Sequence, residues 1–90
     1  MFRFKSGVNA DYDRQGYIHF TSRQYKRMSK EDQKKIIELC KDSGGEYCDA
    51  LLEFVTTEIS VTALTLKHYI SKATLYRLVK KYYENFPDKF

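Results

Sequence analysis

Two patterns of hydrophobic and polar residues follow one another along this chain, and the change falls near Ser22. Phe2–Lys5 alternates apolar and charged residues, and Tyr17–Thr21 is rich in residues that favour strands. Between these stretches lie the turn-forming residues Gly7, Asn9, Asp11, Asp13 and Gly16. The pattern predicts a β-hairpin within residues 1–28, and an extended N-terminal arm fits the same residues nearly as well.

Helical spacing begins at Ser29. Ser29 and Asp32 have the spacing of a capping box, in which side chains satisfy the open amides of a helix start. The helix that follows is predicted to end at Gly44-Gly45, because glycine readily adopts the left-handed conformation found there. A second helix is predicted over residues 46–57. Its apolar stripe consists of Tyr47, Leu51 and Val55.

Two more helices are predicted toward the C-terminal end. Ser60 is expected to cap a short helix over residues 61–68, and Ser71 a last helix over 72–86, which Pro87 ends. One side of the last helix is apolar and consists of Leu75, Leu78, Val79, Tyr82 and Phe86. The opposite side is basic with one aromatic residue, and consists of Lys72, Tyr76, Arg77, Lys80 and Lys81. We therefore expect a mainly α fold with a helical domain over residues 29–90.

Size and composition narrow the class of protein. Ninety residues form one small domain, and 42% hydrophobic with 31% charged residues is the balance of a folded soluble chain. No apolar run approaches the roughly 18 residues of a membrane helix. Residues 1–5 lack the apolar core of a signal peptide, so we expect a cytoplasmic protein without a membrane partner.

The charge is uneven along the chain, although the net charge is only +4. Residues 1–30 carry seven basic residues (Lys or Arg) and two acidic residues. Residues 31–60 carry three basic and eight acidic residues, and residues 61–90 carry six basic and two acidic residues. The segments therefore have net charges of +5, −5 and +4. An acidic middle between two basic ends indicates a polarised surface that faces an anionic partner, although solvated helix faces with an incidental bias explain the same numbers.

Catalytic and metal-binding motifs are missing from the sequence. The cysteines, Cys40 and Cys48, and the histidines, His19 and His68, lack the pair spacings of zinc sites. Two cysteines on apolar helix faces are typical of buried, reduced thiols. No nucleophile elbow, glycine-rich phosphate loop or paired carboxylates with a nearby base occur. We expect no enzyme, no metal, no cofactor and no small-molecule ligand.

Residues 60–86 have the layout of a helix-turn-helix. A short helix, a tight turn and a capped second helix suit two helices that cross at a steep angle. The seam between the helices is predicted to consist of Leu64, Ile70, Leu75 and Leu78. The start of the second helix then projects outward, as a reader of the DNA major groove must.

At these residues the chain resembles known families. Ile70–Arg77 is similar to the turn and recognition-helix start of homeodomain-like helix-turn-helix modules, such as those of serine recombinases and TetR-type repressors. Tyr47–Asp88 resembles bacterial regulators of the stage III sporulation protein D group. Tyr69 departs from that pattern, since these modules usually have glycine there. The resemblance implies sequence-specific DNA binding by a transcriptional regulator from a bacterium or phage.

We predict that this surface contacts double-stranded DNA. The expected base contacts are Lys72, Ala73, Tyr76 and Arg77, and the expected phosphate contacts are Ser71, Lys80 and Lys81. Arg77 could form paired hydrogen bonds to guanine, and the Ala73 methyl group could touch thymine. Because a lone helix-turn-helix buries little surface, we expect a homodimer on repeated half-sites.

The competing hypothesis is a small protein–protein interaction module, such as a phage or mobile-element adaptor, whose basic helix face binds an acidic partner.

Overall fold

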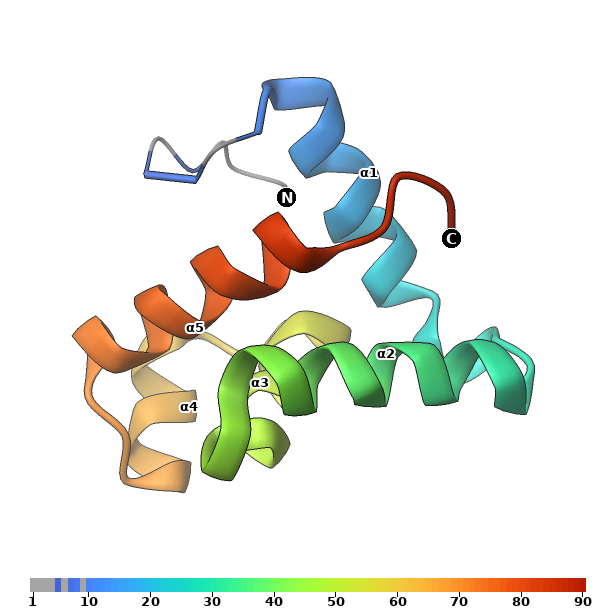
Figure 1. Ribbon diagram of the computed structural model, residues 1–90. Coiled ribbons are helices and arrows are strands. Elements are labelled where there is room, and N and C mark those ends of the chain that lie inside the picture. Colours follow the sequence, from blue (N-terminus) through green and yellow to red (C-terminus); the bar gives the residue numbers. More distant parts are fainter. Residues whose placement is uncertain (1–4, 6, 9) are drawn as a thin grey trace.

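The computed structural model describes residues 5, 7, 8 and 10–90, and this part of the chain is mainly helical and contains no strand (Figure 1). The prediction of a mainly α fold is therefore confirmed. The elements in chain order are α1 (Tyr12–Arg23), the 3₁₀ helix η1 (Tyr25–Arg27), α2 (Lys30–Gly44), the 3₁₀ helix η2 (Gly45–Tyr47), α3 (Cys48–Thr56), α4 (Val61–His68) and α5 (Lys72–Asn85).

All five α-helices contribute to one hydrophobic core. α2 packs against both α3 and α5, while α1 lies beside the C-terminal end of α5 (Figure 1). The fully buried apolar side chains come from every α-helix: Ile18, Ile36, Cys40, Leu51, Leu64, Leu75 and Tyr82. α1 packs on α3, and α4 packs on both α3 and α5. The C-terminal pair α4–α5 therefore belongs to the same core as α1. No helix in the described part of the chain is long and apolar enough to cross a membrane.

The N-terminal prediction of strands is wrong for Tyr17–Thr21, which lie in α1. Asp11 caps this helix, with its Oδ1 atom accepting a hydrogen bond of 2.8 Å from the amide of Arg14. The residues that α1 buries have helical spacing: Gln15, Ile18 and Ser22. The strand propensity of this stretch is overridden by burial of that face in the core. The other expected strand, over residues 2–5, lies almost wholly outside the described residues.

Polar contacts at both ends of α1 fix it to α5 and the segment that follows. Near the start of α1, Arg14 Nη2 donates to the carbonyl oxygens of Phe86 and Pro87, each at 2.7 Å. Near its end, the buried hydroxyl groups of Ser22 and Tyr82 lie 2.7 Å apart. A buried hydroxyl without a partner is costly, so the second contact specifies the register of α1 on α5.

The predicted helix starts after Ser29, Ser60 and Ser71 are confirmed. Each serine Oγ accepts a hydrogen bond from the amide three residues later, at 3.2, 3.1 and 3.1 Å respectively. α2 ends at the predicted glycine pair, and Gly45 has φ 54° and ψ −120°, which a residue without a Cβ adopts readily. The helix predicted over 46–57 is shorter, since its first turn is the 3₁₀ helix η2.

A three-residue turn joins α4 to α5. Tyr69 ends α4 in the left-handed conformation, with φ 54° and ψ 45°, and its side chain is 93% exposed. The Ile70 side chain is buried, and its amide donates to the carbonyl oxygen of Thr65 at 3.2 Å. Ser71 then caps α5. This turn reverses the chain within three residues, and Ile70 anchors it in the core.

We expect Tyr69→Gly to stabilise the protein by about 0.5–1 kcal/mol, because glycine removes the Cβ clash of the left-handed conformation. The exposed tyrosine ring loses no packing in this change. Thermal unfolding should show a higher Tm. Tyr69→Ala is the control, since it removes the ring but retains the clash and should leave Tm nearly unchanged. A lower Tm for Tyr69→Gly than for Tyr69→Ala would contradict the assignment of strain to this turn.

Candidate nucleic-acid interface

α5 has a buried side and an exposed side, as its periodicity predicts. Its buried residues are Leu75, Leu78, Val79, Tyr82 and Tyr83. The residues predicted to contact DNA are all exposed: Ser71, Lys72, Ala73, Tyr76, Arg77, Lys80 and Lys81. The structure therefore brings the seven residues together on the outer face of one helix and its cap.

The exposed residues of α5 form two rows, because side chains four residues apart lie above one another on a helix. One row consists of Lys72, Tyr76 and Lys80. The neighbouring row consists of Ala73, Arg77 and Lys81. Lys80 also lies 4.0 Å from Glu84 in an exposed ion pair, which contributes little to stability in water.

The second row borders a groove of about 370 Å³ between α5 and the corner where α2 meets η2. Arg77 and Lys81 line this groove from α5, and Asp42 and Glu46 line it from the opposite side. Arg77 and Lys81 therefore share this groove with two carboxylates, although the described residues show no ion pair between them. Lys72, Tyr76 and Lys80, which form the first row, do not line this groove.

The start of α5 presents a positive helix end beside Lys72. Ser71 Oγ accepts from the Thr74 amide at 3.1 Å and donates to Thr74 Oγ1 at 2.9 Å. The Ser71 side chain thus satisfies the amide of Thr74, one of the open amides in the first turn of α5. The amides of residues 72 and 73 belong to the same first turn. Such amides, together with the helix dipole, favour an anion at this end.

α4 is held against α3 by a carboxylate. Glu53 Oε1 lies 2.9 Å from Nε2 of His68, and Lys67 Nζ donates to Glu53 Oε2 at 3.0 Å. Hydrogen bonds from His68 and from Lys67 lower the pKa of Glu53, so it stays ionised at neutral pH. Lys67 is therefore paired with an acid, unlike the lysines at positions 72 and 81, for which no ion pair is seen in the described residues.

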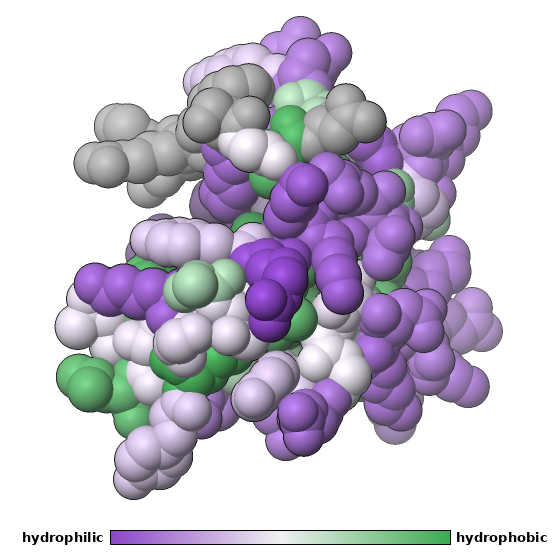
Figure 2. Space-filling view, turned by 60° about the vertical axis from the view of Figure 1, so that its left-hand side comes forward, coloured by the Kyte–Doolittle hydropathy of each residue, from purple (hydrophilic) through white to green (hydrophobic). Residues whose placement is uncertain are grey.

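Sequence patterns did not single out two exposed side chains of this segment. Leu66 on α4 is 72% exposed and Tyr69 in the turn 93% exposed, while the predicted contact Tyr76 is 57% exposed. Figure 2 brings this side of the molecule forward and shows hydrophobic residues at the surface among hydrophilic ones. Leu66 lies two residues after the buried Leu64, and this spacing was the available sign that it faces outward.

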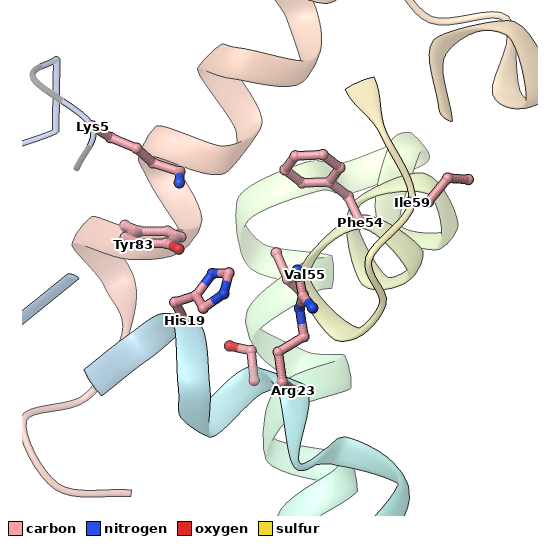
Figure 3. Close-up of a pocket in the computed structure, with 8 residues that line it drawn as sticks. Lys5, His19, Arg23, Phe54, Val55, Ile59 and Tyr83 are labelled. Atoms are coloured by element: carbon pink, nitrogen blue, oxygen red, sulfur yellow. The ribbon is translucent and has the colours of Figure 1, made fainter. Parts of the chain in front are cut away.

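A second polar cluster lies around a cavity of about 80 Å³ between α1, α5 and the end of α3 (Figure 3). Lys5, His19, Arg23 and Tyr83 point their polar ends toward this cavity. Burial, and then the charges of Arg23 and Lys5, lower the pKa of His19 to about 4 against an opposing effect of Glu58. These residues are separated by up to 78 positions in the sequence, so no local motif predicted the cluster.

The cysteines are part of the helix packing. Cys40 is fully buried, and burial followed by the proximity of Cys48 raises the pKa of its thiol to about 12. The thiol is therefore protonated at neutral pH and packs as a small apolar group. Among the described residues, no three His, Cys, Asp or Glu side chains are arranged to hold a metal ion.

Comparison with known proteins gives no family assignment: no family model matches the chain, and no curated protein or solved structure is significantly similar to it.

We expect His19 to destabilise the fold in acid. Its pKa is near 6.5 in the unfolded chain and about 4 in the folded protein, so the unfolded chain binds the proton more tightly. The contribution of His19 to stability is therefore present above pH 6.5 and is lost as the pH decreases toward 4. Because solvent screens this partly exposed ring, we expect a loss of about 1–2 kcal/mol. Urea unfolding of the wild type and His19→Gln at about pH 7 and about pH 4 measures the effect. If the free energy of unfolding decreases equally in the wild type and in His19→Gln between these two pH values, the acid sensitivity does not come from His19.

Proposed function

We propose that this chain is a sequence-specific DNA-binding protein, a transcriptional regulator, in which α4 and α5 form a helix-turn-helix and α5 reads the major groove. One observation carries the proposal: the seven residues predicted to contact DNA share the exposed side of a helix that directly follows a tight, capped turn. The resemblance of residues 47–88 to stage III sporulation protein D regulators points to the same function.

The dimensions of α5 suit the groove. Its 14 residues span about 21 Å, and an α-helix with its side chains is about 10–12 Å wide, close to the width of the major groove. The N-terminal end of α5 lies at the edge of the molecule, next to α4 (Figure 1). A duplex can therefore approach this end without first meeting α1.

In this proposal the first two turns of α5 contact bases. Lys72, Ala73, Tyr76 and Arg77 lie there, on the exposed side. The guanidinium of Arg77 can donate two hydrogen bonds to guanine, and the Ala73 methyl group can pack on a thymine methyl group.

The remaining residues hold the backbone. Ser71 caps the N-terminal end of α5, and that end attracts a phosphate. Lys80 and Lys81 lie one turn beyond Arg77, where the helix leaves the groove and reaches the backbone. One such helix contacts few base pairs. We therefore propose a homodimer that binds two half-sites, one turn of DNA or a multiple of it apart.

An acidic protein partner is the second candidate. The exposure of Leu66 and Tyr69 beside a basic helix favours it, because interfaces between proteins combine apolar and aromatic anchors with a charged rim. DNA binding and this alternative differ in whether a duplex binds at all.

We expect Arg77→Ala to weaken binding to the preferred site by about 1–3 kcal/mol and to relax base preference at one position, since paired hydrogen bonds to guanine would be lost. Affinities for the preferred duplex and for a scrambled duplex measure this. Arg27→Ala, an exposed arginine of η1, is the matched control and should bind as the wild type does. Equal losses on both duplexes would reduce Arg77 to a backbone contact.

We expect DNA binding to weaken steeply with salt, with a slope of log K against log salt of about −0.9 for each phosphate contacted. Replacing both Lys80 and Lys81 with Gln should flatten the slope by up to about 2 for each protomer, on all sequences alike. Lys30→Gln combined with Lys34→Gln is the control, because these exposed lysines lie in the first half of α2, away from the start of α5. An unchanged slope in the Lys80/Lys81 variant would remove both residues from the interface.

A further inference from the structure

We propose that the cavity between α1, α5 and the end of α3 is a binding site for a single phosphate-type oxyanion, separate from the outer face of α5. Three nitrogen-bearing side chains and one phenol converge on it: Lys5, His19, Arg23 and Tyr83 (Figure 3). Val55 and Ile59 form part of its apolar wall. We call this site the cationic pocket.

A buried side chain holds Lys5 at the pocket. Gln15 is fully buried on α1, and its Oε1 atom accepts from the Lys5 amide at 2.7 Å. Its Nε2 atom donates to the Lys5 carbonyl oxygen at 2.9 Å. Both backbone polar groups of Lys5 are therefore fixed by one side chain. The Lys5 ammonium group lies 5.0 Å from the centre of the Tyr83 ring, which orients it over α5.

The pocket offers donors of three kinds. Arg23 and Lys5 supply positively charged donors, and His19 supplies a ring N–H in either tautomer. Burial raises the pKa of Tyr83 to about 12, despite the opposing charge of Arg23, so its hydroxyl keeps its proton at neutral pH. Tetrahedral oxyanions present several acceptor oxygens, and this donor set matches them.

The local charge is unbalanced toward positive. Arg23 Nη1 lies 3.2 Å from Glu58 Oε1, and the Glu58 side chain is 82% exposed. Among the described residues, Glu58 is thus an exposed carboxylate beside Arg23 at the rim of this cluster, and its charge opposes the effect of Arg23 and Lys5 on His19. Burial, and then the charge of Arg23, lower the pKa of Lys5, and burial and the same arginine lower that of His19. A bound anion would relieve this repulsion, because an opposite charge favours the charged forms of both groups.

The volume limits the ligand. A cavity of about 80 Å³ has room for a few water molecules or one tetrahedral anion, and is too small for a nucleotide. The phosphate group could belong to a free anion or to the DNA backbone.

Sulfate is the probe, because its charge is constant across the titration of His19. NMR of the histidine ring measures the pKa of His19 with and without saturating sodium sulfate, against sodium chloride at equal ionic strength. We expect sulfate to raise this pKa by about one unit or more. We also expect Tm to rise with sulfate concentration as binding linkage requires. A His19 pKa unchanged by sulfate would overturn the proposal.

Two variants separate a site from a general salt effect. Arg23→Gln should abolish the response of the His19 pKa and of Tm to sulfate, whereas Arg27→Gln, an exposed arginine of η1, should retain it. If Arg23→Gln proves poorly folded, Lys5→Gln replaces it and should weaken the response. A rise of Tm in sulfate that is equal in all variants, with no change in the His19 pKa, would contradict the pocket.

Adding a DNA duplex in place of sulfate identifies the source of the anion. If the backbone supplies the phosphate, the duplex raises the His19 pKa and sulfate competes with it. If the ligand is free in solution, the duplex binds without changing the His19 pKa. Both results uphold the pocket, and the sulfate measurements decide the proposal even if the chain binds no DNA.

Discussion

The direction of α5 depends on one turn, in which Tyr69 is left-handed, Ile70 is buried and Ser71 caps the next helix. A residue with a Cβ pays a conformational cost in the left-handed region, and the burial of Ile70 compensates for it within the same turn. Any other exit from α4 would remove Ile70 from the core or rotate α5. The outer face of α5 is therefore determined by packing on its inner face.

The rest of the molecule reinforces that arrangement. The hydroxyl contact between Ser22 and Tyr82 and the donation from Arg14 to the carbonyls after α5 fix α1 at the far end of the same helix. The contact of Glu53 with His68 fixes α4 on α3. α5 is thus held at both ends. A rigid helix with one exposed side is what an interaction surface needs, since its side chains are positioned before a partner binds.

The parts that the sequence could predict are those with local signals. Serine caps and the glycine pair mark helix ends whatever surrounds them, so the bounds of α4 agree with the prediction. The period of α5 separated its buried from its exposed residues for the same reason. The strand expected over Tyr17–Thr21 failed because burial in the core outweighed strand propensity. The cationic pocket joins residues from both ends of the chain, such as Lys5 and Tyr83, and such a juxtaposition exists only after folding.

Selection of duplexes from a random pool by the purified chain at low salt tests the central claim most directly. The proposed function predicts that an enriched motif emerges and that it contains two related half-sites, as a dimer requires. Loss of the enrichment when the same selection is repeated with Arg77→Ala would link the motif to α5. If the folded chain retains no duplex above background, DNA binding is contradicted. The acidic protein partner is then the better explanation of the basic face.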